Sequence, residues 1–118
     1  MSCTSCHAVH GEGDRIETSI EPSSVCTSCH AEVEGPWVFE HEAMDEGCQF
    51  CHDAHGSANR KLLTMSNNTL CLQCHFQTAF PTINGANHEL FVGAGANCWE
   101  CHFEVHGSNS SPSFSPGR

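Results

Sequence analysis

The sequence is poor in the side chains that build an ordinary protein interior. It contains no tyrosine, and leucine, isoleucine and valine are scarce among its 118 residues. Such a chain cannot build an aliphatic core large enough to offset the conformational entropy that is lost on folding. We therefore expect something other than side chains to fill the middle of the molecule.

Basic residues and long apolar runs are also scarce, and each shortage excludes a class of protein. Four lysines and arginines stand against 14 acidic residues, which gives a formal net charge of −10. Nucleic-acid binding needs a basic face, so no nucleic-acid partner is expected. No apolar run approaches the roughly 20 residues of a membrane helix, so no transmembrane segment is expected.

Cysteine and histidine, in contrast, are abundant, with ten residues of each. Every cysteine belongs to a Cys-x-x-Cys pair, and a histidine directly follows every pair. In chain order, motifs 1 to 5 are Cys3/Cys6/His7, Cys26/Cys29/His30, Cys48/Cys51/His52, Cys71/Cys74/His75 and Cys98/Cys101/His102.

This pattern is the attachment signature of c-type haem. Positions i, i+3 and i+4 share one face of a helical turn, so two thiols can reach the two vinyl groups of one porphyrin. The adjacent histidine then lies under the iron. The sequence predicts five covalently bound c-type haems, with the ten cysteines as attachment points and the motif histidines as proximal iron ligands.

Three other uses of cysteine pairs fit less well. Zinc sites need an even number of pairs or extra ligands, and they do not require a histidine after each pair. Thioredoxin-like redox pairs need βαβ domains, for which this chain has no room. A disulfide framework normally links distant cysteines rather than near neighbours.

Five haem irons leave five further axial positions, and five histidines remain to fill them. These are His10, His41, His55, His88 and His106. We therefore predict that every haem has two histidine ligands. An iron that binds substrate needs an open position, and the count leaves none. The prediction is electron transfer with no catalytic residue, and the alternative is a small multihaem reductase with one displaceable axial ligand.

The spacing of some histidines restricts which haem they can serve. His52 and His55 lie on the same side of one turn, so they cannot approach opposite faces of one porphyrin. We expect His55 to bind a different haem, and the same holds for the corresponding histidines of motifs 1 and 5. If these histidines all bound the neighbouring haem in the same direction along the chain, the first or the last of them would have no neighbouring haem to bind. That histidine would then bind another haem of the same chain or a haem of an adjacent protomer, and ligand exchange of the second kind would build a filament.

The rest of the chain predicts a mostly irregular fold, with short α-helices around a column of stacked haems and little or no β-sheet. Ser23 and Ser24, like Ser66 to Asn68, are cap residues that predict helices entering motifs 2 and 4. Glycines in the apolar segment 90–96 favour a loop, and histidine-glycine pairs such as His55-Gly56 indicate helix ends. We predict a pentahaem domain over residues 1–106 and a Ser/Pro-rich tail over residues 107–118.

Three stretches carry a family resemblance. They are Gly35-Pro36-Trp37-Val38-Phe39-Glu40-His41 and the His-Gly-Ser segments that follow motifs 3 and 5. They resemble the C-terminal half of the decahaem conduit cytochromes, which carry electrons across the outer membrane inside a porin sheath. The pattern is also similar to the small pentahaem cytochromes that donate electrons to periplasmic nitrite reductase.

The resemblance implies bis-histidine haems in a near-linear chain. It also implies redox partner proteins as donor and acceptor, with an outer-membrane porin or self-assembly into a filament as further partners. The expected location is the periplasm, the outer membrane or the cell exterior. Because c-type haem is attached outside the cytoplasm, an export signal is expected for the protein, and these 118 residues do not contain one.

Overall fold

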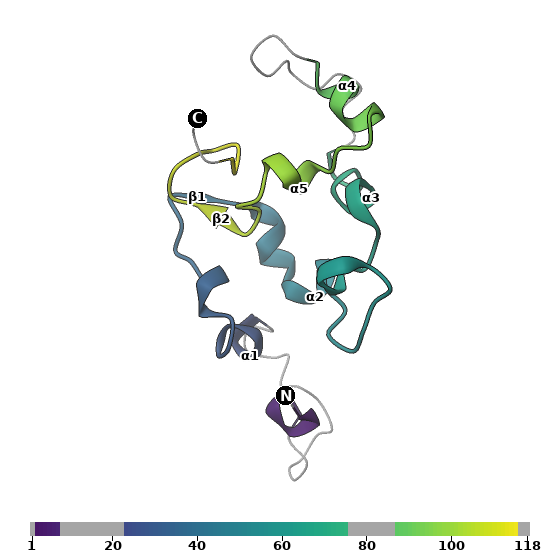
Figure 1. Ribbon diagram of the computed structural model, residues 1–118. Coiled ribbons are helices and arrows are strands. Elements are labelled where there is room, and N and C mark those ends of the chain that lie inside the picture. Colours follow the sequence, from purple (N-terminus) through teal and green to yellow (C-terminus); the bar gives the residue numbers. More distant parts are fainter. Residues whose placement is uncertain (1, 8–22, 76–86, 116–118) are drawn as a thin grey trace.

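The structure is a computed structural model that describes residues 2–7, 23–75 and 87–115 (Figure 1). Its α-helices are α1 (Ser23–Thr27), α2 (Cys48–Cys51), α3 (Asn67–Cys71), α4 (His88–Gly93) and α5 (Cys98–Cys101). Short 3-10 helices are η1 (Cys3–Ser5), η2 (Ala31–Val33), η3 (Glu42–Glu46) and η4 (Arg60–Leu62). Two strands, β1 (Phe39–Glu40) and β2 (Gly107–Ser108), form the sheet. The predicted fold class, mostly irregular with short helices and little sheet, is confirmed; the haem column stays a prediction.

Each of the five motifs folds around one helical turn. In every motif the backbone N–H of the histidine donates to the carbonyl of the first cysteine, four residues earlier. The distances are 2.9 Å for motifs 1, 2, 3 and 5 and 3.0 Å for motif 4. This bond is the repeating unit of an α-helix, so it places the histidine of a motif one turn beyond its first cysteine, as the spacing predicted.

The second cysteine lies inside a helix in motifs 3 and 5 but not in the other three motifs. Helices η1, α1 and α3 end before Cys6, Cys29 and Cys74. The backbone N–H of each of these residues donates to the first cysteine of its motif, at 3.2, 3.1 and 3.3 Å respectively. Such bonds between residues three apart commonly tighten the last turn of a helix. They keep the second cysteine close to the first although the regular helix has ended.

The predicted helices entering motifs 2 and 4 are confirmed, because α1 and α3 begin directly ahead of Cys26 and Cys71. The loop predicted for residues 90–96 is wrong over its first part, which belongs to α4. The Asn87 side chain accepts a hydrogen bond from the Glu89 N–H (2.9 Å), and this N-cap stabilises the helix despite its terminal glycine.

The interior of the polypeptide is not filled by its own side chains. Among the described residues no apolar side chain is buried, and the least exposed side chain is that of Ser108, at 1%. The radius of gyration is 16.8 Å, whereas a compact domain of this length has about 13.5 Å. The extents of 58 × 31 × 23 Å describe an elongated molecule, in which η1 and α4 lie toward opposite ends (Figure 1).

A small antiparallel sheet ties the middle of the chain to its end (Figure 1). Phe39 of β1 pairs with Ser108 of β2, and Glu40 pairs with Gly107. The helix end expected at His106-Gly107 is therefore wrong. Helix α5 already ends at Cys101, and Gly107 begins a strand at φ 145°.

The segment after motif 5 is in contact with the rest of the described structure. The Val38 N–H donates to Asn109 Oδ1 at 3.1 Å, and the Glu104 N–H donates to the Phe114 carbonyl at 3.1 Å. The predicted boundary between residues 106 and 107 stays a prediction. Within the described ranges, no helix is long and apolar enough to cross a membrane.

Candidate haem-binding site

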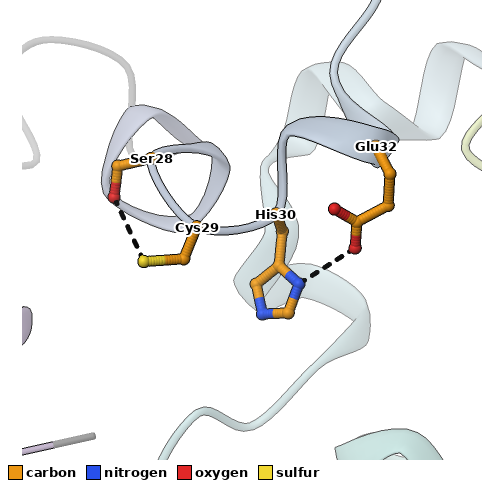
Figure 2. A network of polar contacts seen from close by, with 4 residues as sticks. All are labelled: Ser28, Cys29, His30 and Glu32. Carbon is orange, nitrogen blue, oxygen red and sulfur yellow. Dashed lines mark hydrogen bonds and ion pairs between the residues drawn. The ribbon is translucent and has the colours of Figure 1, made fainter.

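The predicted attachment cysteines differ in how far they are exposed. Four thiols belong to exposed residues, and the other six to half-buried ones; the exposed residues are Cys3, Cys29, Cys74 and Cys101. Cys6 is half-buried at the end of η1. The Cys29 sulfur accepts a weak hydrogen bond from the Ser28 hydroxyl at 3.9 Å (Figure 2). Every one of the ten cysteines is at least partly exposed, so each is accessible to the vinyl group of a porphyrin. Their role as attachment points stays a prediction.

Thiols of consecutive motifs lie close to one another. Burial raises the pKa of the Cys26 thiol, and a thiol of motif 3 and Cys6 of motif 1 raise it further. Burial likewise raises the pKa of Cys51, with a smaller contribution from Cys74 of motif 4. Burial raises the pKa of Cys71 to about 11, and a thiol of motif 5 adds to this effect. Since like charges in proximity disfavour ionisation, the motifs follow one another in space in their sequence order.

Eight histidine rings form four pairs, and each pair joins a motif histidine to a histidine outside the motifs. In all four pairs the ring planes are within 24° of parallel. The centroid separations are 5.9 Å for His7 and His55, 6.3 Å for His75 and His41, 6.2 Å for His52 and His106, and 6.1 Å for His102 and His88.

These separations suit two imidazoles on opposite sides of one metal ion. An imidazole nitrogen lies about 2 Å from the metal it binds, and the ring centre lies about 1 Å beyond that nitrogen. Two such rings on one axis therefore have centroids about 6 Å apart. The residues present thus fit the two axial positions of haem iron at four of the five motifs.

The hydrogen bonds of three paired rings leave the correct nitrogen free for a metal. Each ring donates from Nδ1 to a backbone carbonyl, which can only accept. The bonds run from His41 to Val105 (2.7 Å), from His52 to Lys61 (2.7 Å) and from His102 to Ser113 (2.6 Å). With the proton on Nδ1, the lone pair of Nε2 is available for iron, and the carbonyl fixes the orientation of the ring.

The surroundings of His106 favour its neutral form, which is the form that binds metal. Burial lowers its pKa, and the neighbouring His52 and His41 lower it further, while Glu32 raises it. A neutral imidazole binds metal, whereas an imidazolium ion does not. Ser108, two residues after His106, donates a hydrogen bond to the Glu104 carboxylate.

Motif 2 differs in the partner of its histidine. His30 bonds from Nδ1 to a carboxylate oxygen of Glu32 at 3.2 Å, and both side chains are exposed (Figure 2). The other nitrogen of the ring points away from the carboxylate (Figure 2). His10, the remaining predicted ligand, lies outside the described residues.

No pattern in the sequence indicates the groups that orient the histidines. The carbonyl that holds His52 belongs to Lys61, which with Leu62 adopts a left-handed backbone at φ 59° and 56°. Neither residue type favours that conformation. The carbonyl that holds His102 belongs to Ser113, in the segment predicted as a tail. In the same segment, Phe114 places its ring 5.2 Å from that of a paired histidine, His41.

The structure offers no support for the other uses of cysteine pairs. All ten cysteines are described, and none of them forms a disulfide bond. A structural zinc site collects four ligands. The described part of the chain contains no group of three or more histidine, cysteine, aspartate or glutamate side chains that could hold a metal ion.

Two comparisons with known proteins concern the sequence that carries these motifs. The family described as the doubled CXXCH motif matches residues 1–35 and 41–80. The multiheme cytochrome MtrA of Shewanella baltica (strain OS185) is 39% identical over 121 residues. The alignment covers 92% of this chain and 35% of that relative, so the chain spans about a third of the length of the relative it matches.

Proposed function

Since the chain belongs to the doubled CXXCH motif family and is a multihaem c-type cytochrome similar to MtrA, we propose that it binds five haems and relays single electrons along them. The observation that carries the proposal is the set of four near-parallel histidine pairs with centroids 5.9–6.3 Å apart. Each pair supplies one motif histidine and one other histidine, which is the composition of a bis-histidine site. With both axial positions filled, an iron exchanges electrons without binding substrate.

The ring pairs assign an axial partner to most motif histidines. His55 serves motif 1, His106 serves motif 3, His41 serves motif 4 and His88 serves motif 5. The count then leaves His10 for motif 2, which uses each histidine once. The assignment supports the prediction that His55 binds a different haem from the motif 3 histidine, and that His106 binds a different haem from the motif 5 histidine.

The assignment also supports close spacing of the irons. Only two residues separate His52, a ligand of motif 3, from His55, a ligand of motif 1. The thiols of consecutive motifs are neighbours as well. Each haem supplies a one-electron couple, and the polypeptide sets its potential through the axial ligands, their hydrogen bonds and burial. A continuous row of haems follows from these short links.

Four ligand pairs are completed within one chain, so they supply no histidine to a neighbouring protomer. A filament built by exchange of these eight ligands is therefore disfavoured, whereas assembly by surface contact needs no such exchange. Among the described residues no contact favours a displaceable ligand, and we propose electron transfer rather than catalysis. The proposed location is the periplasm, the outer membrane or the cell exterior, with redox proteins as donor and acceptor.

The test is made on the haem-loaded protein. Pyridine haemochrome and iron analyses should give five haems per chain. Electron paramagnetic resonance should show low-spin ferric haem, and carbon monoxide should leave the spectrum of the reduced protein unchanged. A count below five, or carbon monoxide binding by the unmodified protein, would contradict the proposal.

One substitution tests the axial role directly. His55→Ala should open one position at the motif 1 haem, so carbon monoxide should bind to one fifth of the haem. Gln49→Ala, at an exposed position inside motif 3, is the matched control and should leave the protein unreactive. An experimental map of the irons then checks the pairing, because His55 beside the motif 3 iron would refute the assignment.

A further inference from the structure

The four histidines with a described Nδ1 bond fall into two chemical kinds. His41, His52 and His102 donate to backbone carbonyls, which are neutral. His30 instead bonds to the Glu32 carboxylate, an anion at neutral pH. The difference lies in the charge of the acceptor, because all four rings use the same nitrogen, Nδ1.

The charge of the acceptor changes how strongly the histidine ligand stabilises the oxidised form of the iron. A carboxylate hydrogen-bonded to a metal-bound histidine raises the basicity of that ligand. A more basic ligand, with a negative charge behind it, stabilises the oxidised iron more than the reduced iron. Hydrogen bonding and local charge are among the factors by which a protein sets a haem potential.

The local backbone holds the carboxylate in place. His30 is the N-cap residue of η2, and Glu32 lies in the first turn of that helix. The Val33 N–H donates to the His30 carbonyl at 3.2 Å, which fixes the turn between ligand and carboxylate. The Glu32 side chain therefore reaches the His30 ring from the same short helix. Because only one residue separates the two in the sequence, the carboxylate stays close to the ring.

Glu32 also faces the site of the next motif. It lines a cavity of about 200 Å³ together with Trp37, Phe103, Glu104 and His106. His106 is the axial ligand assigned to motif 3. The carboxylate thus lies at the junction between motif 2 and motif 3, with Glu104 as a second acidic side chain on the same cavity.

We propose that Glu32 is a positioning residue that lowers the reduction potential of the motif 2 haem through its hydrogen bond to His30. This inference rests on the proposed function, because it requires a haem at motif 2 with His30 as a ligand. Glu32 acts through the histidine and does not itself touch the iron.

The test compares two isosteric substitutions in the haem-loaded protein at pH 7. Glu32→Gln keeps an acceptor oxygen beside His30 but removes its charge. Glu34→Gln removes the same charge two residues away, where the side chain is exposed and accepts a hydrogen bond from Thr27 Oγ1 at 3.4 Å instead. Potentials are measured by spectroelectrochemical titration, and ligand fields by electron paramagnetic resonance.

Glu32→Gln should raise the reduction potential of one of the five one-electron steps most, by about a tenfold change in its equilibrium constant, which corresponds to about 59 mV. Any rise in the step of the motif 3 haem, whose assigned ligand His106 lines the same cavity, should be smaller. One low-spin signal should shift with it. Glu34→Gln should produce a smaller change spread over several steps and no shifted signal. Equal changes in the two variants, or no selective step in Glu32→Gln, would overturn the inference.

The haem count separates this inference from the proposed function. If both variants bind five low-spin haems and behave alike, the role of Glu32 is refuted while the electron relay stands. If the unmodified protein lacks five low-spin haems, the proposed function itself fails.

Discussion

Gly107→Ala tests whether the sheet that joins β1 to β2 supports the haem ligands. Gly107 lies at φ 145°, where a residue with a Cβ is strained by about 1–3 kcal/mol. An added Cβ would also lie 2.7 Å from Trp37 Nε1 and closer still to two other atoms of the indole. Such overpacking costs about 1–3 kcal/mol more. We therefore expect Gly107→Ala to lower the free energy of unfolding by about 2–6 kcal/mol.

Gly56→Ala is a matched control, because it shares the backbone strain and lacks the collision. Gly56 also follows a predicted ligand, its φ is 137°, and nothing lies within 4 Å of an added Cβ. Its cost should be limited to the strain of about 1–3 kcal/mol. Guanidinium unfolding of the haem-loaded variants, followed by circular dichroism in the Soret region, measures both. Equal losses of stability in the two variants would refute the proposed role of the Trp37 contact.

Three further substitutions test contacts that hold the motifs in place, each measured by the same unfolding experiment. Asn68→Ala should cost about 2 kcal/mol, because the Asn68 side chain accepts a hydrogen bond from the Cys98 N–H at 2.8 Å and donates one to the Ala96 carbonyl at 2.9 Å. A loss of stability below about 0.5 kcal/mol would show that these two hydrogen bonds contribute little. Ser108→Ala should cost about 2–3 kcal/mol, because the buried Ser108 hydroxyl accepts hydrogen bonds from the Ser110 and Ser111 N–H groups and donates one to Glu104, and all three bonds are lost. The exposed Ser113→Ala, in contrast, should change stability by less than about 0.5 kcal/mol. Lys61→Gly should raise stability by up to about 1 kcal/mol, since glycine relieves the left-handed backbone, and a loss of stability would contradict this expectation.

The local chemistry could be predicted from the sequence because it depends on residues close together in the chain. The attachment of one haem needs two cysteines and a histidine within about one turn, and that turn closes through a bond between residues four apart. The number of motifs and the number of spare histidines are likewise properties of composition. The helices entering motifs 2 and 4 were also predicted, although Ser66, the N-cap residue of α3, makes no side-chain capping bond.

The sequence predicted local structure less well where neighbouring residues favour different structures. The glycines of residues 90–96 favoured a loop, but the Asn87 cap begins a helix just before them. The motif spacing did not show that the helix ends before the second cysteine in motifs 1, 2 and 4. The His106-Gly107 pair favoured a helix end, whereas the real constraint on Gly107 is the indole of Trp37, far away in the sequence. A single sequence does not reveal such a contact.

The tertiary structure alone decided which histidines face each other. His7 meets His55, and His52 meets His106, across separations that no periodic pattern encodes. It also decided which groups orient the rings, because three of the described partners are backbone carbonyls, which every residue possesses. The sequence by itself therefore determined how many histidines are available as ligands and which cysteines are predicted to attach each haem, since covalent attachment is local. The pairing of ligands and the tuning of each site depend on how distant segments fold together.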